Sequence, residues 1–189
     1  NTVVLNYMGY RLDGSTTLVE GLVEGLVEGG SPVQASFFGQ SSFARHAVVT
    51  ADNAVKVDAD LDLARLGPFG CAFQTGASTV LNVLDPGAGD TLVVYGVGAV
   101  GLTALAAARS RGVATVAVDL KPERLEAAAG LGATIVNPAD LADTPLPDRI
   151  REVTGGGASH ALDTTGVTAV IRDAVAGLRP RGTMAVLGL

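Results

Sequence analysis

Three glycines near the middle of the chain have a spacing that suits a specific kind of chemistry. Gly96, Gly98 and Gly101 directly follow the apolar run Thr91–Tyr95 and fit the pattern G-x-G-x-x-G. In this pattern the first glycine permits a tight turn, the second lets a diphosphate approach the backbone, and the third lets a helix pack closely on a strand. We therefore predict that a cofactor contacts the whole turn: Gly96, Val97, Gly98, Ala99, Val100 and Gly101.

An acidic residue stands where a ribose-binding carboxylate is expected. Asp119 ends a second apolar run, 114–118, and follows Gly101 at close to the ~20 residues typical of such an acid. A carboxylate there accepts hydrogen bonds from the ribose of NAD and repels the 2′-phosphate of NADP, so NAD is the predicted cofactor. Two alternatives are glycines that serve packing alone and a methyltransferase that binds S-adenosylmethionine. The three-glycine spacing favours the dinucleotide.

The segments around these residues alternate between strand and helix patterns. Predicted strands cover residues 91–95, 114–118, 133–136, 160–163 and 183–187. Predicted helices cover residues 102–111, 122–130, 147–154 and 167–178, and a turn is expected at 179–182. This order predicts an α/β fold with a doubly wound, parallel (Rossmann) sheet. A ligand should bind where its first and fourth strands end, which places residues 163–166 and 187–189 beside the glycine turn. Thr165 is counted among the cofactor-binding residues.

Composition and charge exclude several classes of protein. The 189 residues are 48% apolar and carry a formal net charge of −6, which disfavours nucleic acids and anionic membranes as partners. The chain lacks the ~18-residue apolar run of a membrane-spanning helix and begins without a basic leader pattern, so a cytoplasmic protein is expected. The single cysteine, Cys71, rules out a disulfide framework within this chain.

The N-terminal third has a different character. Residues 36–49 and 54–57 are rich in aromatic and β-branched residues and predict antiparallel strands. Before them, the repeat L-V-E-G at 18–29 places a glycine in every helical turn, so we expect a mobile surface loop there. Residues 61–84 are predicted to be helical with a break at 67–70. We therefore predict two domains, residues 1–66 and residues 67–189.

Four segments together resemble a known family. They are F-F-G-Q-S-S-F-A at 37–44, G-C-A-F-Q-T-G at 70–76, the glycine turn, and Val118 with Asp119. In this order they resemble the medium-chain, zinc-dependent alcohol dehydrogenases, and most of all the aryl-alcohol (benzyl-alcohol) branch. The resemblance implies a GroES-like β domain, a Rossmann domain and a catalytic zinc between them. Residues 1–66 would then be a β-rich remnant of the GroES-like catalytic domain.

The resemblance also assigns roles to single residues. Cys71 matches a protein ligand of the catalytic zinc. Thr75 and Val100 match positions that pack against the nicotinamide, and Thr75 is on this basis assigned to the catalytic centre. Arg124 matches a basic residue that flanks the adenosine. Three further residues match the nicotinamide-side wall: Val167, Leu187 and Leu189.

Several family features have no counterpart in this sequence. These are the first two zinc ligands, the Ser or Thr of the proton relay, the cysteine-rich structural-zinc lobe and the last sheet strand. We therefore expect a fragment of an enzyme that, when intact, is a homo-oligomer (dimer or tetramer) and transfers hydride between an aryl alcohol or aldehyde and NAD. The fragment alone is predicted to be inactive. The alternatives are a non-catalytic NAD-binding module and a zinc-free quinone or enone reductase, which usually prefers NADPH.

Overall fold

A computed structural model describes residues 27–28, 31–32 and 55–188 of the chain. It divides into two compact units, Asn1–Leu61 and Asp62–Leu189. In the first unit, β1 (Val27–Glu28) and β2 (Ser31–Pro32) form an antiparallel pair. These two residues of β1 belong to the repeat, so the predicted loop is wrong at that point. The predicted strands at 36–49 lie outside the described residues, and residues 55–57 are in no strand, contrary to the prediction.

The second unit is built on one parallel sheet, as predicted. Its order is β5-β4-β3-β6-β7, and each neighbouring pair runs parallel. The strands are β3 (Thr91–Tyr95), β4 (Ala114–Val118), β5 (Thr134–Val136), β6 (Ala158–Asp163) and β7 (Leu178–Val186). The central strand β3 pairs with β4 on one side and β6 on the other, so the carboxyl ends of β3 and β6 form the switch point of the sheet.

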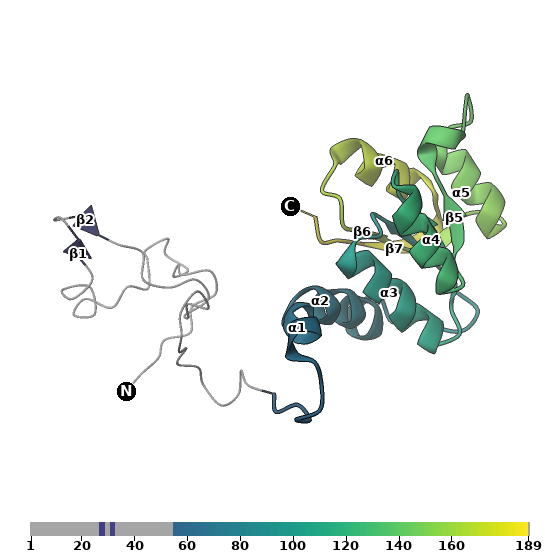
Figure 1. Ribbon diagram of the computed structural model, residues 1–189. Helices are drawn as coiled ribbons and strands as arrows, with labels where there is room; N and C mark the ends of the chain where they lie inside the picture. The colour runs from purple at the N-terminus through teal and green to yellow at the C-terminus, as the bar shows by residue number, and fades with distance from the viewer. Residues whose placement is uncertain (1–26, 29–30, 33–54, 189) are drawn as a thin grey trace. The chain divides into compact units, whose positions relative to one another are not determined.

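Helices cover both faces of this sheet, because β3 is apolar on both faces. Leu92 and Val94 belong to one buried cluster, whereas Val93 and Tyr95 belong to another. The helices are α3 (Ala99–Ser110), α4 (Pro122–Gly130), α5 (Leu146–Thr154) and α6 (Thr168–Ala176). The first cluster includes Leu105 of α3 and residues of α4, and the second includes residues of α5 and α6. Figure 1 shows α3 and α6 on opposite sides of the strands.

A broken helical segment leads into the sheet, as the sequence predicts. It consists of α1 (Leu63–Leu66), a 3₁₀ turn (Gly67–Gly70), α2 (Ala72–Ser78) and a π-helical turn (Thr79–Leu84). Gly76 of α2 packs so tightly that a Cβ there would overlap the carbonyl oxygen of Val100 in α3. Helix α2 therefore lies directly against the start of α3. A further 3₁₀ turn, Pro138–Asp140, follows β5.

Several predicted boundaries differ from the structure, and two of the differences have clear local reasons. Helix α3 begins at Ala99 rather than Leu102, because Gly98 takes the N-cap position and the last glycine of the motif lies inside the first turn. The turn predicted at 179–182 is instead an irregularity within β7. The register jumps there from the pair Ala158–Leu178 to the pair His160–Thr183, and Arg181 has a φ of 66°. The extra residues bulge while pairing continues on both sides.

No helix in the described part of the chain is both long and apolar enough to span a membrane.

One polar group in the core lacks a partner among the described residues. The hydroxyl of Tyr95, on the face of β3 towards α5 and α6, has no hydrogen bond there. Burial, together with the charge of Asp173, raises the pKa of Tyr95 above its ordinary value. The phenol is therefore neutral, and its ring contributes by packing.

Tyr95→Phe is accordingly expected to leave the free energy of unfolding unchanged or to raise it by up to about 1 kcal/mol, because it removes an unpaired buried hydroxyl and keeps the ring. Urea unfolding of the two proteins measures the difference. Ile150→Ala in the same cluster is the control and should cost about 2–5 kcal/mol. A loss above about 1 kcal/mol in the Phe variant would show that the hydroxyl has a partner.

Candidate cofactor-binding site

The turn after β3 has a backbone that requires glycine at its first position. Gly96 has a φ of +84°, and its N–H donates a hydrogen bond of 2.8 Å to the carbonyl oxygen of Val118 in β4. A Cβ on Gly96 would lie 2.6 Å from Thr164 Oγ1 and 2.9 Å from Thr165 Cγ2. Both the dihedral angle and the lack of space therefore exclude any side chain here.

The other two glycines of the motif have contrasting surroundings. A Cβ on Gly101 would overlap the carbonyl oxygen of Gly96 and lie 3.2 Å from Val94 Cγ1, so this glycine provides the predicted close contact of helix and strand. A Cβ on Gly98 would meet nothing within 4 Å. Gly98 is also the N-cap of α3, with no side-chain cap. The start of this helix is therefore open to an approaching anion.

Asp119 lies beside this turn. Its Oδ2 accepts a hydrogen bond of 2.8 Å from Val97 N–H, and its Oδ1 accepts one of 2.9 Å from Lys121 N–H. The side chain is only 7% exposed. Burial by itself would raise the pKa of Asp119, but the N–H groups of Lys121 and Val97 and the charge of Arg124 outweigh it, so the pKa is lowered. Asp119 is consequently a carboxylate at neutral pH.

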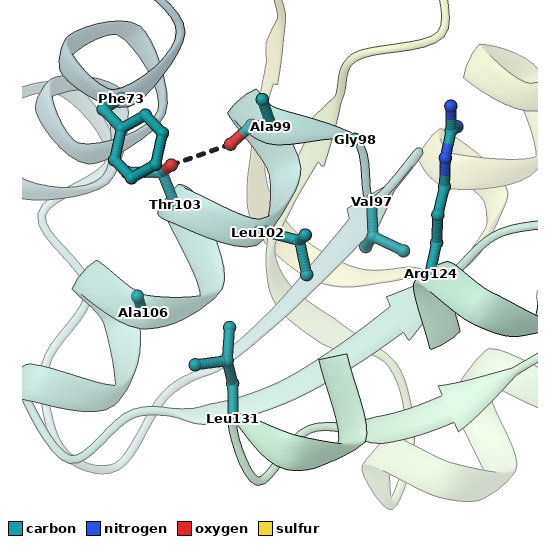
Figure 2. Close-up of a pocket in the computed structure, with 9 residues that line it drawn as sticks. All are labelled: Phe73, Val97, Gly98, Ala99, Leu102, Thr103, Ala106, Arg124 and Leu131. Carbon is teal, nitrogen blue, oxygen red and sulfur yellow. Dashed lines mark hydrogen bonds between the residues drawn. The ribbon is translucent and has the colours of Figure 1, made fainter. Parts of the chain in front are cut away.

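Arg124 is the basic neighbour of this carboxylate. Its Nη1 lies 3.5 Å from Asp119 Oδ2, and its side chain is exposed enough to reach a ligand as well. Figure 2 shows it extending from the start of α4 past Val97 and Gly98. The structure therefore brings together two of the predicted residues, Asp119 and Arg124, with the glycine turn.

The end of β6 forms the other side of the switch point. Asp163 is fully buried, and the turn after it, Thr164–Gly166, folds back over its carboxylate. Thr164 Oγ1 donates a hydrogen bond of 2.8 Å to the carbonyl oxygen of Gly96, which ties this turn to the glycine turn. The sequence analysis placed residues 163–166 beside the glycine turn, as the structure shows, and of these it assigned a cofactor-binding role to Thr165 alone.

The structure describes two of the three residues predicted for the nicotinamide-side wall. Leu187 follows β7, packs partly against the apolar cluster of α3, and donates its N–H to the carbonyl oxygen of Asp163 at 2.8 Å. Val167 precedes α6 and is 51% exposed; its N–H donates to Thr165 Oγ1 at 3.1 Å. Leu189 lies outside the described residues.

Cys71 lies at the start of α2 and Thr75 lies within it. Cys71 is the exposed residue at the N-cap of the helix, and Thr75 lies one turn later, with its N–H donating to Cys71 O at 2.8 Å. The contact of Gly76 with Val100 places this helix next to the glycine turn. Groups of three or more His, Cys, Asp or Glu side chains able to hold a metal ion are absent from the part of the chain that the structure describes.

A cavity of about 580 Å³ adjoins the glycine turn (Figure 2). Its walls come from α2, the glycine turn, α3 and α4, and they are mostly apolar. Four of the lining residues are predicted site residues: Val97, Gly98, Ala99 and Arg124. The sequence analysis did not single out the others, which are Phe73, Leu102, Thr103, Ala106 and Leu131.

The sequence of this chain is similar to those of known dehydrogenases. The family model described as "Zinc-binding dehydrogenase" matches residues 99–189. A geraniol dehydrogenase of Castellaniella defragrans is 45% identical over 188 residues, which cover 98% of this chain and 48% of that protein. A probable alcohol dehydrogenase of a Pseudomonas species is 38% identical over 97% of this chain and 56% of its own length. The chain thus spans about half the length of these curated relatives.

Solved structures agree with the sequence matches. Benzyl alcohol dehydrogenase from Acinetobacter calcoaceticus has a TM-score of 0.74 and 41% identity, over 80% of this chain and 42% of its own. An alcohol dehydrogenase zinc-binding domain protein from Burkholderia ambifaria has a TM-score of 0.77 and 41% identity, over 97% of this chain and 48% of its own. At this level of identity, the parallel sheet and its helices are those of alcohol dehydrogenases. Residues 99–189 of the chain belong to the family of zinc-binding dehydrogenases.

Proposed function

We propose that this chain is the NAD-binding part of an alcohol dehydrogenase, acting on a small alcohol and its aldehyde. The observation that carries the proposal is the position of Asp119, an ionised carboxylate held beside the glycine turn by Val97 N–H. When bound, NAD supplies the ring that accepts the hydride from the alcohol carbon. The residues of this chain bind and orient that cofactor.

Each part of the proposed site has one task. The open backbone at Gly98 and the N-terminus of α3 receive the diphosphate. Asp119 accepts hydrogen bonds from the adenosine ribose, and Arg124 flanks the adenosine. Thr75 and Val100, on the two helices that meet at Gly76, border the nicotinamide half. Four further residues complete this border: Thr165, Val167, Leu187 and Leu189. A 2′-phosphate would meet the Asp119 carboxylate, so NADP is disfavoured.

Zinc does not fit the described residues by themselves. A catalytic zinc site uses three protein ligands, and Cys71 is the one described residue that the family resemblance assigns to it. We assign no step of the reaction to a metal within this segment. In the intact enzyme Cys71 would supply one ligand, and the remaining ligands would come from other parts of the protein.

The rest of the proposal concerns the whole protein. We propose a division into a remnant of the catalytic domain, residues 1–66, and a cofactor domain, residues 67–189. We also propose a homo-oligomeric enzyme of the cytoplasm. Aryl alcohols are the first substrates to test, because one similar structure is a benzyl alcohol dehydrogenase.

Calorimetric titration of the 189-residue chain tests the cofactor assignment. We expect NAD to bind, NADP to bind at least about tenfold more weakly because of repulsion at Asp119, and S-adenosylmethionine to release no heat of binding. Adenosine is the internal reference, since it carries the ribose and no phosphate. Tighter binding of S-adenosylmethionine than of NAD would contradict the proposal.

A further inference from the structure

Asp163 is a buried acid that the proposed function leaves without a role. Its side chain is 0% exposed at the carboxyl end of β6. Oδ1 accepts hydrogen bonds from Thr165 N–H at 3.2 Å and Thr165 Oγ1 at 2.7 Å, and Oδ2 accepts one from Gly166 N–H at 3.0 Å. All these donors belong to the turn Thr164–Gly166. Burying a carboxylate is costly unless it is paired or hydrogen-bonded, so this acid is tied closely to that one turn.

The same turn connects the ends of three strands. Thr164 N–H donates to Tyr95 O at 2.9 Å, and Thr164 Oγ1 donates to Gly96 O at 2.8 Å, which joins the turn to β3. On its other side, a Cβ on Gly188 would lie 2.6 Å from Gly166 Cα, so the chain after β7 passes in close contact. The turn is therefore held between the first glycine of the motif and the end of β7.

The order of the strands decides which half of the cofactor meets this turn. If the adenosine ribose binds Asp119 at the end of β4 and the diphosphate binds after β3, the remaining half must extend towards β6 and β7. That half is the nicotinamide riboside. The wall it meets consists of the turn and the residues that follow β7.

We propose that Asp163 is a positioning residue for the nicotinamide half of NAD, acting through the Thr164–Gly166 turn. This inference rests on the proposed function. The carboxylate supplies acceptors on both of its oxygens, which keep the turn in one conformation before the cofactor arrives. Without them, the cofactor would have to order the turn as it binds, and affinity would fall for that half alone.

The test compares NAD with ADP, which retains the ribose and diphosphate but lacks the nicotinamide riboside. Asp163→Asn has nearly the same shape but presents an N–H₂ group where one carboxylate oxygen accepted hydrogen bonds. We expect its Kd for NAD to rise about tenfold and its Kd for ADP to change by less than about twofold. Asp148→Asn, at an exposed carboxylate of α5, is the control and should change neither.

A second pair of variants covers the case in which Asp163→Asn does not fold. Thr165→Val removes the hydroxyl that donates to Asp163 and should weaken NAD selectively, whereas Thr165→Ser restores the hydroxyl and should recover most of the affinity. Equal losses for NAD and ADP, or no loss in either Asp163→Asn or Thr165→Val, would overturn the inference. If the unmodified chain bound neither ligand, the proposed function would itself be wrong and this inference with it.

Discussion

Replacing Asp119 by glycine is expected to raise the Kd for NAD about a hundredfold and to change the Kd for NADP by less than about tenfold. The reason is that the carboxylate can accept hydrogen bonds from the ribose hydroxyls of NAD, and bonds to a charged acceptor are worth about 1.5–3 kcal/mol each. With NADP the same carboxylate faces a 2′-phosphate, so its removal also relieves a repulsion. For NADP, the loss of hydrogen bonds and the relief of repulsion therefore oppose each other, whereas for NAD only the loss of hydrogen bonds applies.

Calorimetry with both cofactors, at one salt concentration, measures this difference. Asp119→Asn is the matched variant, because it removes the charge and keeps the side-chain length, and it should fall between the two proteins for NAD. Asp119 also accepts hydrogen bonds from Val97 and Lys121, so the thermal unfolding midpoint is recorded for each variant. Equal losses for NAD and NADP would show that Asp119 supports the turn and does not select the cofactor.

Gly101→Ala and Gly98→Ala should separate the two tasks of the glycine turn. A methyl group on Gly101 would overlap the carbonyl oxygen of Gly96, which is backbone and cannot move aside cheaply. We expect the free energy of unfolding to fall by about 3 kcal/mol or more. Gly98 has a φ of −71° and a ψ of −163°, which alanine adopts readily, and open space around it. Its alanine variant should keep stability within about 0.5 kcal/mol.

Gly98→Ala, the variant expected to keep its stability, should nevertheless lose affinity for the cofactor. In Gly98→Ala the new methyl group fills the space that the diphosphate needs, so the Kd for NAD should rise at least about tenfold although the fold is intact. Urea unfolding and NAD titration of both variants provide the comparison. A stable Gly98→Ala protein with unchanged NAD affinity would place the diphosphate elsewhere.

The sheet could be predicted from the sequence because its strands carry their own signal. Thr91–Tyr95 is buried on both faces and therefore reads as a continuous apolar run. Boundaries were harder to predict where glycine has several possible roles. Gly98 caps α3 and Gly101 lies within it, and a local pattern does not distinguish these positions from a loop. The sequence predicts a turn in place of the bulge in β7, because proline and glycine, here Pro180 and Gly182, are found in turns and in bulges alike.

The candidate site could be predicted where function depends on spacing along the chain. The glycine turn and Asp119 are of this kind, because a strand, a turn and a helix fix their separation. The roles of Asp163 and Gly76 could not be predicted in this way, because they depend on partners distant in sequence. Thr164 contacts Gly96, and Gly76 contacts Val100, only after the sheet has formed and α2 has docked on α3.

The hydrogen bonds of Asp119 have a consequence for the thermodynamics of association. Both carboxylate oxygens are engaged by amides of the protein itself, so the rotamer of this side chain is selected during folding. A nucleotide then binds with a smaller entropic penalty, because the conformational entropy of the Asp119 side chain is already lost when the protein folds. The stability of the turn and the affinity for a nucleotide are therefore coupled through one side chain. A change that weakens the hydrogen bonds of Asp119 in the free protein should also lower its affinity for the nucleotide.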